Sequence, residues 1–589
     1  PEDAKNFIGG CGLGTKYLHK LTDTKTDPLG ENNVLVFLIG PLTGTKFFSS
    51  NRYDVVTKSP LTGIYAESNS GGKWGGVLKK SGYDGIIISG KSESPVYIWI
   101  NNKEVKIEDA VDIWGLDDFE LDRILKERTT KDAEVACIGP AGERLVKYAT
   151  ISNEGEHARV AGRAGAGTVM GSKNLKAIVV SGNQDFELFD PEGFEKFFKQ
   201  YSKGMVEGTR GINAYGTSGG VAFCEELGDL PVRNWSWRTF EGTLMITGQY
   251  MAETILKKRY YCGQCMIGCG RVIKIEDGKY KTPGLIGGPE YETIGMLGSN
   301  LLVGNIQAIA RFNELCNRYG IDTITTGSVI GMAMECFEYG LLNKKDLDGI
   351  ELTWGNEDAI IEIIHKIGKR EGIGELLGEG TRAMAKVIGS YADEFAVHVK
   401  GLEAPAHDPR GINSVALGYA TSARGACHLS AFTHDFEGGA CVPDLGYPEP
   451  LNRLETKGKP EYVIKFQNLM NMFDSLTCCK FVLFGGITLK QLTEGLNLIT
   501  GFEFDENTFL KTGERIFNLK RLYNLQYGIT RADDILPPKF LAHKRDKGEN
   551  GALPNLGEML DEYYSLRGWD KLGIPADAKI KELGLDKYI

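Results

Sequence analysis

The hydrophobic pattern of the first 186 residues predicts strands and turns. Short runs rich in β-branched and aromatic residues recur there, and each is closed by glycine, proline or asparagine. We expect strands over 34–39, 85–88, 96–100, 134–138 and 177–180. Such closely spaced, punctuated runs predict a β-rich first domain.

Beyond residue 190 the pattern changes to that of amphipathic helices. Apolar residues that share one helical face predict helices over 306–320, 332–339, 359–367 and 462–473. Asn305 can cap the first of these helices, and Gly320 can end it. Charge and a proline at 185–191 indicate a domain boundary. The chain therefore reads as α+β, with its helices after its strands.

Composition and charge exclude several classes of partner. The chain has 589 residues and a net charge of −10, which argues against nucleic acid or an anionic membrane surface. Its apolar runs are too short for a membrane span. Twelve cysteines scattered through so large a chain are typical of a reduced, cytoplasmic protein.

Two glycine-rich stretches, 68–76 and 161–171, lie between the predicted strands. Such loops can offer backbone N–H groups to phosphates, although either one alone reads equally well as a plain turn. Glycine makes up 76 of the 589 residues, well above the usual share of roughly 7%. Together with Arg52, the two loops favour a large phosphate-bearing cofactor.

Cys262, Cys265 and Cys269 form a C-x2-C-x3-C motif that can place three thiolates around one metal centre. A fourth ligand must come from elsewhere, and the adjacent pair Cys478 and Cys479 can supply it. A structural zinc site is the simpler alternative. The third cysteine of the triad favours an iron–sulfur cluster.

Two helix ends carry similar short signatures, at 317–322 and 474–479. Each can be a plain helix terminator, but together they suggest a ligand with two similar halves. Candidate acid–base groups lie elsewhere, at Glu292 in 287–293 and at His428 in 424–428. The ordinary alternatives are that Glu292 lies in a solvated loop and that His428 is a core histidine. If Glu292 were buried beside a metal, desolvation would raise its pKa and suit it to act as a general base.

Taken together, these motifs resemble the aldehyde ferredoxin oxidoreductase family of tungsten enzymes. The resemblance runs nearly end to end and includes the stretches 40–44, 52–63, 139–143, 170–177 and 288–292. It implies a β-rich base domain at 1–186 and two mainly helical domains at 187–396 and 397–589. These would enclose a tungsten held by two pyranopterin dithiolenes. It also implies that the family's first β-hairpin precedes Pro1.

The resemblance implies ligands residue by residue. Cys262, Cys265, Cys269 and Cys479 would bind a [4Fe–4S] cluster, the last chosen over Cys478 because it lies five residues after Asp474. Arg52 would lie between the cluster and a pterin. Asn69, with Gly71 beside it, would help to hold a Mg²⁺ ion that bridges the pterin phosphates. The Arg163–Ala164 backbone would lie opposite.

The helix-end signatures resemble the two D-x-x-G-L-(C/D) pterin motifs of the family. They depart from it at Asn317, which replaces aspartate, and at Thr477 and Cys478, which replace glycine and leucine. An asparagine still hydrogen-bonds a pterin ring but without charge. The residues expected to bind pterin are Asn317, Gly320, Ile321, Asp322, Asp474 and Cys478.

The implied reaction is oxidation of an aldehyde with water to a carboxylic acid. Glu292 would be the general base on water, and His428 would donate a hydrogen bond to the substrate oxygen. The metal would act as a Lewis acid and accept two electrons, which leave through a pterin and the cluster to ferredoxin or an iron–sulfur subunit. Tungsten and molybdenum would both suit these residues, and the resemblance implies tungsten.

Two alternative functions differ in class. One is the tungsten subunit of a benzoyl-CoA-reductase-type enzyme that reduces an aromatic ring, because fold and cofactor do not decide the reaction. Retention of Glu292 and His428 disfavours it. The other is a non-catalytic iron–sulfur or zinc protein, which would leave the glycine loops and paired signatures without a purpose. A homodimer and a hetero-oligomer are both compatible with the sequence.

Overall fold

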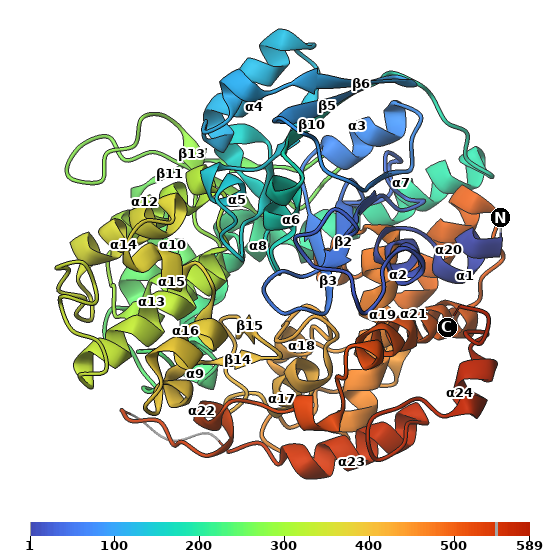
Figure 1. Cartoon of the computed structure of the whole chain (residues 1–589). Coiled ribbons are helices and arrows are strands. Elements are labelled where there is room, and N and C mark those ends of the chain that lie inside the picture. The colour runs from blue at the N-terminus through green and yellow to red at the C-terminus, as the bar shows by residue number, and fades with distance from the viewer. Residues whose placement is uncertain (1, 548–551, 589) are drawn as a thin grey trace.

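The computed structural model describes residues 2–547 and 552–588. Two sheets and their covering helices lie along one side of the molecule, and the later helices fill the rest (Figure 1). The first and last described segments of the chain lie close together, since Lys587 forms an ion pair with Glu2. Among the described residues, none of the helices is long and apolar enough to cross a membrane.

The first sheet has the strand order β3-β2-β1-β4, with every neighbouring pair antiparallel. Its strands are β1 (Leu35–Leu38), β2 (Tyr53–Lys58), β3 (Tyr65–Ser70) and β4 (Gly85–Ile88). Strands β1 and β2 are buried along their whole length. The end of β3 carries the first glycine-rich stretch, so this sheet positions one of the two predicted loops.

The second sheet has the strand order β6-β5-β10-β7-β8-β9. Only the β5–β10 pair is parallel. Its strands are β5 (Val96–Asn101), β6 (Glu104–Asp109), β7 (Glu134–Cys137), β8 (Ile151–Asn153), β9 (Arg159–Ala161) and β10 (Leu175–Ser181). All five strands expected from the sequence are present in the two sheets, and the β-rich start of the chain is confirmed.

The sequence predicted strands and turns here, and the described residues of this region also form α-helices that it did not predict. They are α1 (Glu2–Phe7), α2 (Gly10–Leu21), α3 (Trp74–Lys80), α4 (Asp118–Arg128), α5 (Pro140–Glu143) and α6 (Ala166–Ser172). Helix α6 is buried on every side, so it has no polar face to reveal its period. A Cβ atom at Gly167 would lie 2.2 Å from the Thr150 carbonyl oxygen, so glycine is needed there for close backbone packing.

The middle of the chain is mainly helical, with one small sheet of order β11-β12-β13. Its strands are β11 (Leu256–Tyr260), β12 (Gly270–Ile273) and β13 (Ile286–Gly287). The helices are α7 (Pro191–Gly208), α8 (Arg210–Tyr215), α9 (Val221–Leu227), α10 (Gly248–Thr254), α11 (Tyr291–Leu297), α12 (Ile306–Tyr319), α13 (Thr323–Glu338), α14 (Glu357–Lys369), α15 (Ile373–Leu377) and α16 (Thr381–Ile388).

The predicted helices of this region are confirmed, with one corrected start. Asn305 caps α12 by accepting a hydrogen bond from the Gln307 N–H at 3.1 Å, as expected. Helix α13 begins at Thr323, nine residues before the predicted start at 332. Its residues 324–336 are all buried, and its first turns consist mainly of threonine, glycine and serine, so they show no apolar stripe of helical period.

The last third of the chain is organised around the long helix α19. The elements here are β14 (His398–Val399), β15 (Leu402–Glu403), α17 (Asn413–Thr421), α18 (His434–Glu437), α19 (Lys459–Leu476), α20 (Leu489–Thr500), α21 (Glu506–Gln526), α22 (Pro538–Leu541), α23 (Leu556–Arg567) and α24 (Asp577–Glu582). Helix α19 packs against α2, α17, α21 and α23. The division into domains at 186 and 396 stays a prediction.

Candidate functional site

Four cysteine thiols converge where the β11–β12 loop meets the C-terminal end of α19. Burial raises the pKa of the Cys479 thiol to about 11, Arg52 opposes that rise, and the nearby thiols of Cys265 and Cys262 add to it. Burial also raises the pKa of Cys269, and both Cys262 and Cys479 contribute to its shift. The triad and the fourth cysteine predicted from the sequence therefore lie together.

The backbone around Ser49 joins the two cysteine segments. The Ser49 N–H donates to the Gln264 carbonyl at 3.1 Å, and the Cys479 N–H donates to the Ser49 carbonyl at 3.0 Å. The Ser49 hydroxyl also donates to Cys265 Sγ at 3.3 Å. These bonds bring Cys479 beside a triad from which it is distant in sequence.

Cys478 has different surroundings from Cys479. Its side chain is 2% exposed and lies in a hydrophobic cluster with Phe473 and Phe466. Its thiol donates to the Phe48 carbonyl at 3.5 Å. The geometry therefore favours Cys479 as the fourth ligand and leaves Cys478 as a packed thiol.

The spacing of the four thiols bears on the kind of metal group that they could hold. Four thiolates around zinc, with Zn–S bonds of about 2.3 Å, place their sulfurs about 3.8 Å apart. In the described part of the chain, sets of three donor atoms within 4.8 Å of one another do not include these thiols. The wider spacing suits several iron atoms better than one zinc ion.

Arg52, Asn69 and Gly71 lie together beside the thiols. Arg52 Nε donates to Asn69 Oδ1, and Asn69 Nδ2 donates to Asp54 Oδ1 at 3.0 Å. A Cβ atom at Gly71 would lie 3.1 Å from Cys262 Sγ and 3.2 Å from Arg52 Nη1. Glycine thus lets the guanidinium approach the cysteine loop closely.

The second glycine-rich stretch presents Arg163 and Ala164 to the helical part of the chain. Arg163 is buried, and its Nε lies 3.3 Å from Asp322 Oδ2. Its other nitrogens donate to the carbonyls of Ala426 and Glu403 at 3.0 and 2.7 Å. Ala164 has a positive φ of 64°, which bends the backbone sharply here. This arginine therefore joins three distant segments at one point.

The two helix-end signatures have the same backbone geometry. At the end of α12 the Gly320 N–H donates to Asn317 O, and the Ile321 N–H donates to Cys316 O. At the end of α19 the Thr477 N–H donates to Asp474 O, and the Cys478 N–H donates to Phe473 O. Both ends are therefore Schellman-type caps with a left-handed residue, Gly320 at φ 70° and Thr477 at φ 51°.

Thr477 adopts a conformation that β-branched residues rarely adopt. Its hydroxyl accepts a hydrogen bond from the Gly40 N–H at 2.9 Å and lies 2.6 Å from the Thr43 hydroxyl. These two contacts with the first sheet offset the strain. The departure from glycine thus leaves the backbone of the signature unchanged.

Two carboxylates two residues apart in the 287–293 segment, Glu290 and Glu292, have different partners. Glu290 is held by Arg159 at 3.2 Å and by the Thr217 hydroxyl at 2.6 Å. Glu292, in the first turn of α11, accepts the Ala406 N–H at 2.7 Å through Oε2 only. Its Oε1 is buried without a hydrogen bond in the described structure. Glu292 is therefore the carboxylate that is available for chemistry.

Two imidazole rings face Glu292 Oε1, and a third packs behind them. His428 Nε2 lies 3.3 Å from it and His407 Nε2 lies 3.6 Å from it. His434 packs at a tilt against His407, with ring centroids 3.9 Å apart. The sequence prediction found His428 but missed His407 and His434, which lie in no motif of recognisable spacing. It also missed Asp229, whose Oδ2 is 2.5 Å from His407 Nδ1.

Burial dominates the electrostatics of this group. It raises the pKa of Glu292 to about 8 and that of Asp229 to about 7. It lowers the pKa of His407 to about 3, and it lowers that of His428 well below its ordinary value. At neutral pH the histidines are thus neutral. Glu292 Oε1 and His428 Nδ1 are buried polar atoms without partners, as expected of a site that receives a polar substrate.

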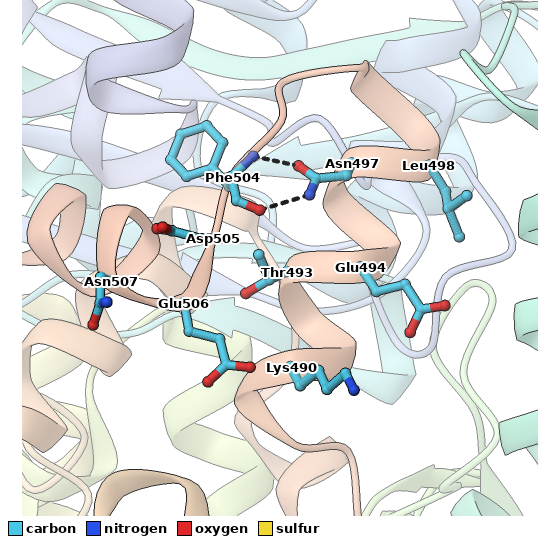
Figure 2. A pocket seen from close by; sticks show the side chains of 9 residues that line it. All are labelled: Lys490, Thr493, Glu494, Asn497, Leu498, Phe504, Asp505, Glu506 and Asn507. Carbon is cyan, nitrogen blue, oxygen red and sulfur yellow. Dashed lines mark hydrogen bonds between the residues drawn. The ribbon is translucent and has the colours of Figure 1, made fainter.

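A surface hollow of about 520 Å³ lies between α20 and the start of α21 (Figure 2). Asn497 crosses it with hydrogen bonds of 2.7 and 2.8 Å to the backbone of Phe504. Its lining includes none of the residues predicted for the site. The hollow is therefore separate from the buried group around Glu292.

Comparisons with known proteins agree with this geometry. Residues 1–182 match the N-terminal domain model of aldehyde ferredoxin oxidoreductase, and residues 194–585 match the model of its domains 2 and 3. Tungsten-containing aldehyde ferredoxin oxidoreductases of Pyrococcus horikoshii and Pyrococcus furiosus are each 40% identical to the chain. Each alignment covers 100% of the chain and 96% of the relative.

Two further relatives widen the range of chemistry. The WOR-like subunit of an aliphatic sulfonate oxidoreductase from Pyrococcus furiosus is 33% identical over 99% of the chain and 93% of that protein. The solved active-site complex BamBC of benzoyl-CoA reductase contains a chain that is 26% identical, with a TM-score of 0.84. That match covers 100% of this chain and 94% of the other. The chain therefore belongs to the aldehyde ferredoxin oxidoreductase family of tungsten-containing oxidoreductases.

Proposed function

We propose that the chain oxidises an aldehyde with water to a carboxylic acid and passes two electrons to ferredoxin or to an iron–sulfur partner subunit. The observation that carries the proposal is Glu292, whose Oε1 lies between the His407 and His428 imidazoles in a buried site. A carboxyl with a pKa of about 8 is suited to proton transfer near neutral pH.

Glu292 takes a proton from the attacking water through Oε1. Oε2 is fixed by the Ala406 N–H at 2.7 Å, so the reactive oxygen keeps one orientation. His428 is neutral, and with Nε2 turned to Glu292 its Nδ1 is the nitrogen left to donate a hydrogen bond to the substrate oxygen. Burial keeps bulk water from competing for these groups.

The residues around this site suit a tungsten held by two pterins. Arg52, Asn69, Gly71, Arg163 and Ala164 would hold the phosphates and the Mg²⁺ ion between them. The two matching caps would each receive one pterin, through Asn317, Gly320, Ile321 and Asp322 at one end and through Asp474 at the other, where the predicted Cys478 is a packed thiol. When bound, this group would supply the Lewis acid and the two-electron acceptor.

Cys262, Cys265, Cys269 and Cys479 would hold a [4Fe–4S] cluster that leads electrons out. Next to the triad, strand β11 exposes Lys257, Lys258 and Arg259 on a chain whose net charge is −10. An acidic electron carrier is therefore the partner that this face suits. Arg52 lowers the pKa of Cys479, as expected of a cation beside the thiolates.

The benzoyl-CoA type of reaction is the second candidate, because that reductase has the same fold as this chain at 26% identity. Glu292 and His428 together suit attack by water better than reduction of a ring. The identity of 40% to aldehyde ferredoxin oxidoreductases also supports the aldehyde.

The test is an anaerobic assay of the tungsten-loaded protein. Acetaldehyde and benzaldehyde should each reduce ferredoxin or a viologen dye, and the carboxylate formed in H₂¹⁸O should carry one labelled oxygen. Benzoyl-CoA with a low-potential donor should give no dienoyl product. Ring reduction without aldehyde turnover would replace the proposal with the second candidate.

A further inference from the structure

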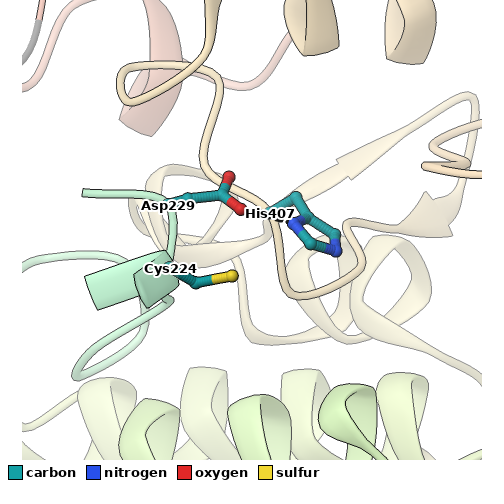
Figure 3. Close-up of side chains that lie close together, drawn as sticks. All are labelled: Cys224, Asp229 and His407. Carbon is teal, nitrogen blue, oxygen red and sulfur yellow. Dashed lines mark hydrogen bonds and ion pairs between the residues drawn. The ribbon is translucent and has the colours of Figure 1, made fainter. Parts of the chain in front are cut away.

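His407 lies directly behind Glu292 and has no part in the reaction as proposed so far. Its ring stacks on Tyr291 with centroids 5.0 Å apart, which fixes its orientation. Figure 3 shows the Asp229 carboxylate directed toward this ring, from the segment that follows α9. The imidazole thus bridges two buried carboxyl groups, with Nδ1 2.5 Å from Asp229 and Nε2 3.6 Å from Glu292.

Aldehyde oxidation must dispose of protons as well as electrons. Conversion of an aldehyde and water to a carboxylate releases two electrons and three protons. The electrons go to ferredoxin or to the iron–sulfur partner subunit. The protons start in a buried site, where the side chains of Glu292 and His407 are only 18% and 6% exposed. Glu292 cannot serve a second water until it has lost the first proton.

We propose that His407 passes the proton of Glu292 to Asp229 and so resets the base, and that His434 and Asp435 continue the path outward. This inference rests on the proposed aldehyde oxidation. In the step, the O–H bond of Glu292 and the Nδ1–H bond of His407 break. An N–H bond at Nε2 and an O–H bond at Asp229 form. The negative charge moves from Asp229 to Glu292, and no electrons are transferred.

The energetics suit a relay through a neutral imidazole. A proton left on His407 would be costly, because burial lowers the pKa of that ring to about 3. Glu292 and Asp229 differ by only about one unit, at about 8 and about 7. Transfer between the two carboxyls is thus nearly balanced. The 3.6 Å gap exceeds a hydrogen bond, so this step needs a small side-chain movement or one bridging water.

His434 provides the outward continuation. Its ring packs at a tilt against His407, it lies near enough to Asp229 to influence the pKa of that carboxyl, and its Nε2 lies 3.6 Å from Asp435 Oδ2. The Asp435 side chain is 41% exposed, in contrast to every other group of the relay. The titratable and charged groups that face the Asp229–His407 pair are Cys224, Tyr291, Glu292, Asp408, His428, His434, Asp435 and Arg545.

The test is His407→Gln in the tungsten-loaded enzyme. Glutamine keeps a polar side chain but cannot move a proton between two ring nitrogens. The first turnover, measured by rapid mixing at pH 9, should stay near the wild-type rate because Glu292 is then already ionised. Steady-state kcat should fall about 10- to 100-fold, with KM within about twofold and a larger solvent deuterium isotope effect.

Asp229→Asn should show the same burst followed by slow turnover. If His407→Gln loses its metals and cannot be assayed, the Asp229→Asn variant tests the relay in its place. His19→Gln is the matched control, since His19 contacts Gln526 far from the site and should behave as wild type. Wild-type steady-state rates in both relay variants, or a first turnover slowed as much as the later ones, would overturn the relay. A wild-type enzyme without aldehyde turnover would instead refute the proposed function.

Discussion

Replacing Glu292 by glutamine tests the proposed base with little change of shape. The amide oxygen can still accept the Ala406 N–H, so the fold of α11 should survive. Burial raises the pKa of Glu292 from 4.5 to about 8. At about 1.4 kcal/mol per pKa unit, ionising this carboxyl in the folded protein costs about 5 kcal/mol more than ionising it in water. The variant should therefore be at least as stable as the wild type, with unchanged tungsten and iron.

The same pKa sets the expected pH dependence. About a tenth of Glu292 is ionised at pH 7 and about nine tenths at pH 9, so wild-type kcat/KM should rise about tenfold between them. Glu292→Gln should lose about 10²- to 10⁴-fold in kcat, or about 3–5 kcal/mol, and should lose the rise with pH.

The assay is anaerobic dye reduction by an aldehyde across pH 6.5–9.5, with metal analysis of every sample. Glu290→Gln is the matched control, because that carboxylate is already engaged by Arg159 and Thr217 and should keep the rise with pH. Near-normal activity of Glu292→Gln, or an unchanged pH profile, would remove Glu292 from the role of base.

Three further predictions concern the cluster, the partner and the fold. Cys479→Ala should lower the iron content, and Cys478→Ala should not; the reverse result would exchange the two cysteines. A double Lys258→Glu, Arg259→Glu variant should raise the KM for ferredoxin about tenfold at low salt and leave dye reduction unchanged. An unaltered KM would place docking elsewhere. Asp534→Asn should destabilise the fold by about 3 kcal/mol, because it leaves the Lys400 and Arg521 cations buried without their carboxylate. These cations lower the pKa of Asp534 below its ordinary value, so its contribution is present at neutral pH and is lost on acidification. Denaturant midpoints at pH 7 and at about pH 2.5 would show an equal deficit at both values if this is wrong, because the contribution is lost only below the ordinary carboxyl pKa.

Local patterns predicted much of the framework. The strand runs, the Asn305 cap and the C-x2-C-x3-C spacing are short-range features, and the structure has each of them. Helix α6 was not predicted, and helix α13 was predicted without its first turns. Both are buried on all sides and therefore have no solvent-facing polar side to mark their period.

Part of the group around Glu292 could not be predicted from the sequence. His407 and Asp229 are 178 residues apart, and only the fold brings them to 2.5 Å. Neither has a neighbour whose spacing predicts a shared role. Their pKa values are shifted by burial, which a sequence does not display. Relay residues of this kind therefore become visible only when the packed structure is known.

Elemental analysis of anaerobically purified protein tests the central claim most directly. The account predicts about one tungsten and about four iron atoms per chain, the iron in a cluster held by Cys262, Cys265, Cys269 and Cys479. Zinc alone, without tungsten, molybdenum or iron after strict anaerobic handling, would contradict the account from the cysteine motif onward.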